Sequence, residues 1–419
     1  MAQTTAGPST QEQFERLTAA SRALWERALG SLPGGNTRTT IFHDPYPVYL
    51  VSGDGCRVTD VDGVERIDFI SNYTSLILGH CHPRVVEAVR RQAGLLMSAA
   101  APNELEIELA ERIRERLPSV EQIRFAGSGT EATMLALRAA RAFTGRNMVA
   151  TFAGGYHGSH DYAASVPADP NASPGGPGIP DAVAETVVVA PFNDIERTRA
   201  AVEPHRAHLA AVIVEPVLGS GGVLPATDEF LAFLRELTRD AGALLVFDEV
   251  ISFRIDYHGA QGRFGITPDL TTLGKIIGGG LPVGAFGGRA DVMALFDPRS
   301  ARPLGHGGTF NANPLTMAAG LATLAELTPE RYDELEALAV ELQDKLTGLF
   351  ADLDVSGSVT RAGSLFNVHL DDAALLRELH LSLLTNGILF TPRGMGCLST
   401  PMTRMEIDAF VDAVRLGLS

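Results

Sequence analysis

Short apolar segments alternate with helical segments through the middle of the chain. This pattern restricts the possible folds more than any other feature of the sequence. Continuous apolar runs of strand length stand at residues 147–152, 186–189, 209–214 and 243–247. Helical patterns lie between them, for example at 130–143 and 229–239. Apolar strands separated by helices are typical of a parallel sheet that helices cover on both faces. The sequence therefore predicts an α/β fold with a mostly parallel central sheet.

The two ends of the chain differ from this middle part. An amphipathic helix is expected at 11–29, then short strands at 48–50 and 57–69, and after Pro314 a mainly helical stretch to about Phe350. A chain of 419 residues is longer than one core usually organises. We therefore expect a large domain at 71–310 and a second, smaller domain, with the segments 1–70 and 311–419 outside the large one.

Charge and membrane patterns exclude some classes of partner. Lysine and arginine total 34 against 50 acidic residues, which gives a net charge of −16, and no basic run is interleaved with aromatic residues. Nucleic acid is therefore not an expected partner. The N-terminus lacks the pattern of a signal peptide, and no apolar run is long enough to cross a membrane.

Cysteine and histidine usage points to a reducing compartment and to no metal site. Cys56, Cys81 and Cys397 are odd in number and far apart, so a disulfide framework is not expected and a cytoplasmic location is. His80-Cys81-His82 resembles a metal cluster, but ligands on nearly consecutive residues rarely converge on one ion.

Lys275 is a candidate nucleophile, because it lies in the apolar, glycine-rich segment Leu273–Gly280. Desolvation there would lower the pKa of its amine. From spacing alone, a Schiff-base lysine and a lysine in a structural loop are equally good interpretations. Asp248 ends the apolar run 243–247, where a carboxylate is costly to bury without a cation. A protonated pyridine nitrogen would be such a cation, although an Asp that caps a helix is the ordinary alternative.

Two further motifs fit the same cofactor. Gly127-Ser128-Gly129-Thr130 follows the strand-like segment 122–125 and opens a helix, as in sites that bind a phosphate group. Tyr156 follows the run 147–152 and could stack on a flat ring, although a core aromatic is the commoner reading. Each motif is weak alone. A lysine, a strand-end carboxylate, a phosphate loop and a stacking aromatic are together the parts of a pyridoxal-5′-phosphate (PLP) site.

At these residues the sequence resembles the class III aminotransferases of PLP fold type I, from Leu32-Pro33-Gly34-Gly35 to about Pro401. The resemblance implies that both termini, 1–70 and 311–419, form one smaller α+β domain. It also implies a homodimer with shared active sites, Lys275 as the Schiff-base lysine and Asp248 as the partner of the pyridine nitrogen. The other residues that it assigns to the cofactor are Val250 and Tyr156 on the two ring faces, Ser128, Gly129 and Thr130 at the phosphate, Thr309 from the partner subunit, and Glu215. Where the family often has a polar partner for the ring hydroxyl, this chain has Leu218 and Ser220.

Two subfamilies share most of these motifs. Glutamate-1-semialdehyde 2,1-aminomutases share Leu32–Gly35 and the Lys275 region, but this chain lacks their N-terminal N-S-P-V-R, their S-W-G-P and their C-terminal E-A-G-F. The segments Ser71–Thr74 and Arg393–Gly396 instead resemble β-phenylalanine aminotransferase and related β-amino acid transaminases. In that group, arginines matching Arg38 and Arg393 bind carboxylates, which a guanidinium can do with two parallel hydrogen bonds.

The sequence thus predicts a PLP-dependent transaminase that takes an amino donor, in particular a β-amino acid such as β-phenylalanine, and a keto acid acceptor, 2-oxoglutarate or pyruvate. The alternative is the intramolecular amino shift of an aminomutase. The loop 168–180, rich in Pro, Gly, Asn and Ser, is either a lid over the site or a surface excursion.

Overall fold

The computed structural model describes residues 8–164, 166–169 and 171–419. The chain divides into two compact units: unit 1 comprises Met1–His82 and Glu334–Ser419, and unit 2 comprises Pro83–Asp333. Both boundaries lie later in the chain than the positions 70 and 310 expected from the sequence. No helix among the described residues combines the length and the apolar character needed to span a membrane.

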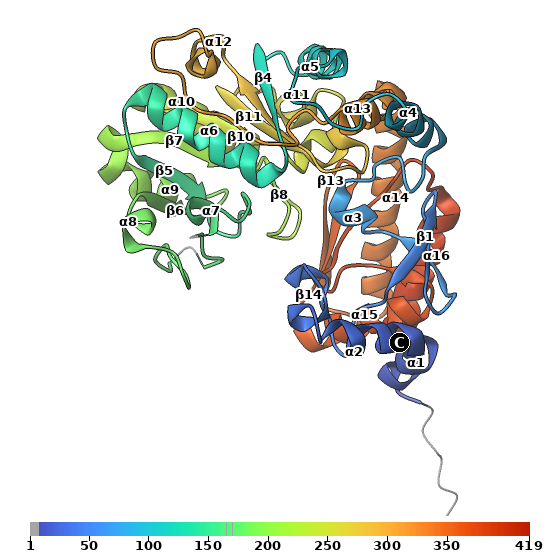
Figure 1. Cartoon of the computed structure of the whole chain (residues 1–419). Helices are drawn as coiled ribbons and strands as arrows, with labels where there is room; N and C mark the ends of the chain where they lie inside the picture. The colour runs from blue at the N-terminus through green and yellow to red at the C-terminus, as the bar shows by residue number, and fades with distance from the viewer. Residues whose placement is uncertain (1–7, 165, 170) are drawn as a thin grey trace, which may run out of the picture. The chain divides into compact units, whose positions relative to one another are not determined.

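Unit 2 is built around a mostly parallel sheet, as predicted (Figure 1). In the part of the chain that the structure describes, the neighbouring strands are in order β4 (Gln122–Ala126), β12 (Gly284–Gly288), β11 (Leu270–Gly274), β10 (Leu244–Asp248), β7 (Leu209–Val214), β5 (Met148–Phe152) and β6 (Val187–Ala190). β12 runs antiparallel to both of its neighbours, and the other pairs are parallel. The predicted apolar runs therefore form four of these strands, with bounds that differ by one residue at most.

Both faces of this sheet are buried, which explains why its strands are apolar without alternation. Leu245 and Phe247 belong to one core cluster, which α10 (Asp228–Ala241) joins. Leu244 and Val246 point to the opposite face and belong to another cluster, which α6 (Gly129–Thr144) joins. Successive residues of a strand point to opposite faces, so helices on both sides require an apolar residue at every position.

The remaining helices of unit 2 surround this sheet. They are α4 (Pro83–Ala93), α5 (Glu104–Arg116), α7 (Asp161–Ala164), α8 (Asp181–Ala184), α9 (Ile195–Val202), α11 (Gly259–Phe264), α12 (Ala290–Met293) and α13 (Pro314–Glu326). The short strands β8 (Val217–Leu218) and β9 (Leu224–Pro225) form a separate antiparallel pair. The described residues of the loop 168–180 contain no helix or strand, and its role as a lid stays a prediction.

Unit 1 combines segments from both ends of the chain, which meet in one small sheet. β3 (Glu65–Asp68) pairs with β15 (Ile388–Leu389), in the order β1 (Leu50–Asp54), β2 (Arg57–Asp60), β3, β15. A second sheet contains β13 (Gly357–Ala362), β14 (Leu365–Leu370) and β16 (Met395–Cys397). The helices of this unit include α14 (Pro329–Asp352), most of which belongs to it, α15 (Ala373–Thr385) and α16 (Arg404–Leu418).

The single helix expected at 11–29 is wrong, because the chain forms α1 (Thr10–Leu17) and α2 (Ala19–Ala28) with a break at Thr18. The Thr18 hydroxyl donates to the carbonyl of Phe14, 2.7 Å away, and its backbone leaves the helical region. The Asp62 carboxylate accepts the backbone N–H of Ser21 at 2.9 Å. A residue far along the chain therefore caps α2, which local periodicity could not indicate.

Candidate active site

The predicted cofactor residues lie where the parallel strands end. Ser128 follows β4, Tyr156 follows β5, Glu215 follows β7, Asp248 ends β10 and Lys275 follows β11. Parallel strands present their carboxyl ends at one edge of the sheet, where ligands bind in open α/β folds. The fold of unit 2 thus gathers the side chains that the sequence motifs singled out.

Asp248 is buried and its carboxylate accepts hydrogen bonds from three groups. Oδ2 lies 2.7 Å from His157 Nδ1, and Oδ1 accepts from the Thr272 hydroxyl at 3.0 Å and from the backbone N–H of Val250 at 3.2 Å. A carboxylate has about four acceptor positions. One position therefore remains for a further donor, as binding of a protonated pyridine nitrogen requires.

His157 and Asp248 form a buried ion pair. Burial opposes the charged form of His157, but the hydrogen bond to Asp248 and the charges of Asp248 and Glu215 outweigh it, so the pKa of His157 is raised. The imidazole thus lies directly behind the carboxylate at the end of β10 and orients it.

Lys275 begins the 3₁₀ helix η5 (Lys275–Gly278) and has a left-handed backbone, with φ of +50°. Burial lowers the pKa of its amine, with a smaller effect of Arg254 in the same direction, while Asp248 and Glu215 oppose the shift. A partly buried amine with a lowered pKa is a competent nucleophile toward a carbonyl carbon. Strained backbone at a non-glycine residue is also more frequent at functional sites.

The predicted phosphate loop lies at the N-terminus of α6, where Ser128 accepts the backbone N–H of Glu131 at 3.2 Å. Gly129 faces Val250: a Cβ at Gly129 would lie 3.2 Å from the Val250 methyl groups. Gly284 of β12 passes so close to the Ser128 carbonyl that a Cβ there would clash with it. Glycines at these positions leave the backbone N–H groups of the helix terminus open to an anion.

Glu215 is hydrogen-bonded to the loop that follows β5 and carries Tyr156. Its carboxylate accepts the backbone N–H of Tyr156 at 2.9 Å and that of Gly219 at 3.4 Å. Burial raises the pKa of Glu215 to about 7, with a contribution from Asp248, against the lowering effects of His157 and the two N–H groups. The Tyr156 side chain is 56% exposed, and its stacking on the cofactor stays a prediction.

These residues fit PLP: a partly buried amine with a lowered pKa, a carboxylate with one acceptor position left, and a glycine-lined helix N-terminus adjoin one another in unit 2. Thr309 is exposed in the single chain, and its role in a partner subunit stays a prediction. Sequence reasoning missed His157 and Thr272. His157 stands next to Tyr156 in the sequence, but Thr272 pairs with Asp248 only through the register of β10 and β11.

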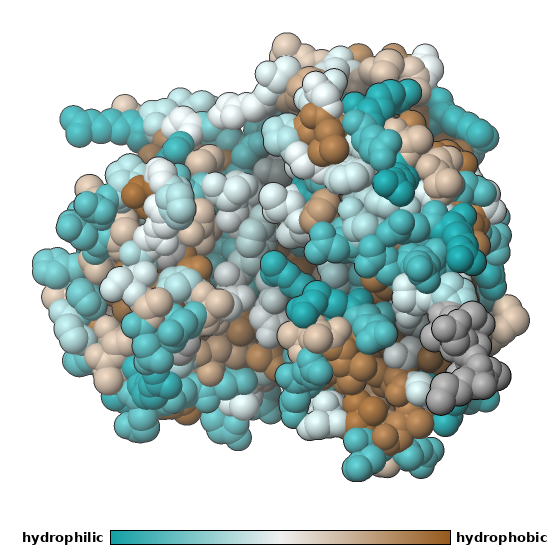
Figure 2. Space-filling model, turned by 90° about the horizontal axis from the view of Figure 1, so that it is seen from below, coloured by the Kyte–Doolittle hydropathy of each residue, from teal (hydrophilic) through white to brown (hydrophobic). Residues whose placement is uncertain are grey.

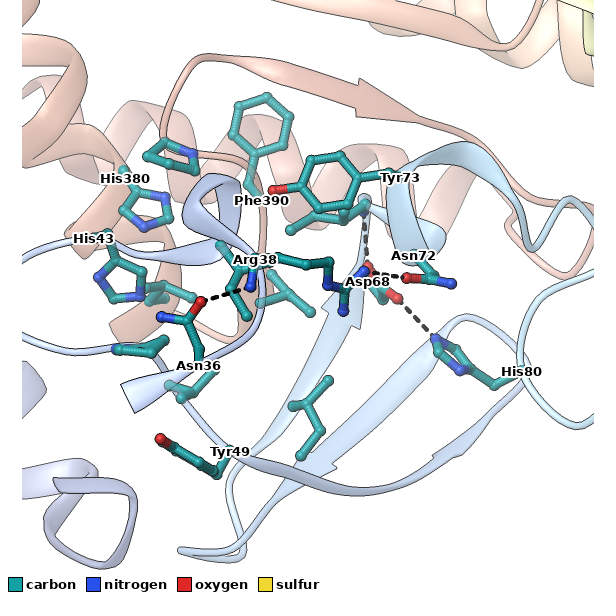
Figure 3. A pocket seen from close by; sticks show the side chains of 18 residues that line it. Asn36, Arg38, His43, Tyr49, Asp68, Asn72, Tyr73, His80, His380 and Phe390 are labelled. Atoms are coloured by element: carbon teal, nitrogen blue, oxygen red, sulfur yellow. Dashed lines mark hydrogen bonds and ion pairs between the residues drawn. The ribbon is translucent and has the colours of Figure 1, made fainter. Parts of the chain in front are cut away.

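Arg38 lines a pocket of about 340 Å³ in unit 1, shown in Figure 3. Its guanidinium Nη1 donates to Asn72 Oδ1 at 3.0 Å, and it makes no ion pair with a carboxylate among the described residues. Most of the other lining side chains are apolar or aromatic; they include Ile41, Val48, Tyr49, Leu384, Leu389 and Phe390. Arg393 is exposed and is not among the residues that line this pocket, although its neighbour Pro392 is.

Comparison with known proteins places this site in a family. The model for aminotransferase class III matches residues 41–411. The chain is 42% identical over 425 residues to a β-phenylalanine transaminase of Variovorax paradoxus, with 98% of this chain and 93% of the relative covered. It is 46% identical over 352 residues to a glutamate-1-semialdehyde 2,1-aminomutase of Geobacillus kaustophilus, with 82% of each covered.

Solved structures agree with this assignment. The crystal structure of an omega-transaminase from Sphaerobacter thermophilus superposes with a TM-score of 0.92 at 48% identity, covering 95% of this chain and 97% of that one. The PLP fold type I expected from the sequence is therefore confirmed. The family model, which matches most of the chain, and these relatives together show that this chain belongs to the class III aminotransferases and is a PLP-dependent enzyme.

Proposed function

We propose that the enzyme transaminates a β-amino acid such as β-phenylalanine, with 2-oxoglutarate or pyruvate as amino acceptor. The observation that carries this proposal is Arg38, whose guanidinium faces a largely apolar pocket without a carboxylate partner among the described residues. Such a pocket suits an acid with an apolar or aromatic side chain, because the guanidinium binds the carboxylate and the walls bury the rest. The relative from Variovorax paradoxus supports the same substrate class.

In the proposed mechanism, PLP supplies an electron sink at its ring. Lys275 would hold the cofactor and, when its amine is free, carry a proton to and from the substrate carbon, which the lowered pKa of the amine favours. Asp248 would hold the ring nitrogen in its protonated form, with His157 behind it. Ser128, Gly129 and Thr130 would bind the phosphate at the N-terminus of α6. Val250 and Tyr156 would contact the two ring faces.

The enzyme is proposed to act as a homodimer with shared sites, to which Thr309 would contribute from the partner subunit. Leu95, Met97 and Phe310 are 71%, 61% and 67% exposed. The segments that carry them adjoin each other, since Asn313 donates its side-chain N–H to the Met97 carbonyl at 2.9 Å. Separately, the face of the molecule drawn in Figure 2 shows apolar side chains gathered in a patch among more hydrophilic ones. Exposed aliphatic and aromatic residues in adjoining segments are typical of an interface.

An aminomutase is the second candidate, because the chain is 46% identical to a protein of that name. The two functions differ in their need for a second substrate. An amino donor screen on PLP-loaded enzyme would compare β-amino acids, α-amino acids and glutamate-1-semialdehyde, each with and without a keto acid. Keto product from a β-amino acid that depends on the acceptor supports the proposal. Formation of 5-aminolevulinate without any acceptor would contradict it and establish the aminomutase. A cytoplasmic location stays a prediction.

A further inference from the structure

A left-handed turn forms one wall of the Arg38 pocket. Ser71, Asn72, Tyr73 and Thr74 have φ of +47°, +48°, +52° and +73°, a region that side-chain-bearing residues other than Asn and Asp rarely adopt. Four such residues in succession persist only where the surroundings hold them in place. The turn therefore demands a structural or functional explanation.

Hydrogen bonds at both ends hold this turn. Asp68 Oδ1 accepts the backbone N–H groups of Ile70 at 2.7 Å and of Ser71 at 2.9 Å. The Tyr73 hydroxyl donates to the Thr40 carbonyl at 2.6 Å, which joins the turn to the segment that carries Arg38. The position of Asn72 relative to Arg38 is thus defined by contacts of their neighbours, independently of their own hydrogen bond.

Arg38 donates a hydrogen bond to the neutral side chain of Asn72 in this turn, although the carboxylate of Asp68 lines the same pocket. Asp68 is the one acidic residue among those described as lining the pocket. Both of its oxygens are engaged elsewhere, Oδ1 by the turn and Oδ2 by His80 Nε2 at 2.7 Å. The amide oxygen of Asn72 accepts the hydrogen bond from Arg38 Nη1 instead. Figure 3 shows these side chains around Arg38.

We propose that Asn72 is the residue that positions Arg38 for carboxylate recognition, because its amide orients the guanidinium without neutralising it. This inference rests on the proposed function of Arg38. An aspartate at position 72 would fit the same left-handed backbone but would pair with the guanidinium and compete with the substrate carboxylate. Asn72 would therefore determine specificity for acids over uncharged analogues, and it takes no part in the chemical step.

The test measures the preference for a carboxylate on the holoenzyme. Dissociation constants of 3-phenylpropanoate and of its neutral amide, 3-phenylpropanamide, are determined by calorimetry at one pH and ionic strength. The preference for the acid is the dissociation constant of the amide divided by that of the acid, and for Asn72→Asp we expect this ratio to fall at least tenfold. For Asn72→Gly, which suits the positive φ but removes the acceptor, we expect a severalfold fall. The absorbance of the bound cofactor reports that each variant is loaded.

Two further variants separate the possible failures. Asn193→Asp makes the same substitution at an exposed asparagine with φ of +58° in unit 2, and it should leave the ratio unchanged. Arg38→Gln should abolish the carboxylate preference if the proposed function is right. If Arg38→Gln abolishes the preference but Asn72→Asp keeps it within twofold, the positioning role is refuted and the function stands. If Arg38→Gln also keeps it, both are refuted.

Discussion

Replacement of His157 is the most informative perturbation of the predicted cofactor site, because it changes the hydrogen bonding and charge around Asp248 while Asp248 itself is kept. His157 Nδ1 lies 2.7 Å from Asp248 Oδ2, and the two side chains are 2% and 3% exposed. Leucine at position 157 would remove the donor and leave the carboxylate with only its two contacts on Oδ1. Glutamine would keep a neutral N–H donor within reach and remove only the charge.

The burial of both partners and general energies for buried ion pairs and hydrogen bonds give the expected size of each effect. Breaking one side of a buried ion pair costs about 3–5 kcal/mol, which corresponds to a loss of roughly a hundredfold to several thousandfold. Hydrogen bonds to charged groups are stronger than neutral ones by about 1–1.5 kcal/mol, so the glutamine variant should lose only about tenfold. We expect these losses in kcat/KM for the amino donor, because Asp248 would no longer hold the ring nitrogen in its protonated form.

The assay follows the donor reaction at saturating PLP, so that weaker cofactor binding is measured separately. Thermal unfolding gives a second readout. The pKa of His157 is raised in the folded protein, so its stabilising effect is complete below about pH 6.5, its usual pKa, and is lost as the pH rises through the folded value. Both variants should flatten that decline. Leucine and glutamine variants with kcat/KM within threefold of each other would refute the ion-pair reasoning.

Other predictions follow from single contacts. Lys275→Ala should abolish turnover and the absorbance of covalently attached cofactor together; unchanged multiple turnover would exclude Lys275 as the cofactor lysine. Gly284→Ala should weaken PLP binding at least tenfold, a cost of about 1.4 kcal/mol or more, because its Cβ would clash with the Ser128 carbonyl; Gly348→Ala, where a Cβ meets open space, is the control in the same titration. Burial lowers the pKa of His380 well below 6.5, so the folded state resists its protonation and stability should fall as the pH drops below 6.5. His380→Leu should reduce the fall of the thermal midpoint between pH 6.5 and lower pH. An equally steep fall in the variant would contradict the lowered pKa of His380 as its cause.

Much of unit 2 follows from local sequence. A strand buried on both faces must be apolar at every position, so its run of residues identifies it without knowledge of its neighbours. Residues just after such runs emerge at the carboxyl edge of a parallel sheet, so the place of Asp248 could also be predicted, and that of Ser128 from the strand-like segment 122–125 before it. The strands β11 and β12 were not assigned in this way. β12, Gly-Ala-Phe-Gly-Gly, lacks the apolar run, because close approach of the backbone at Gly284 excludes side chains.

What the sequence by itself determined is therefore the class of fold and the chemical types at the cofactor site. The tertiary structure alone decided which of these groups touch. Strand register brings Thr272 to Asp248, and a loop from β5 brings His157. The approach of two distant segments places Asn72 against Arg38. Such contacts depend on long-range packing, whereas periodicity and motif spacing report only on residues near each other in the chain.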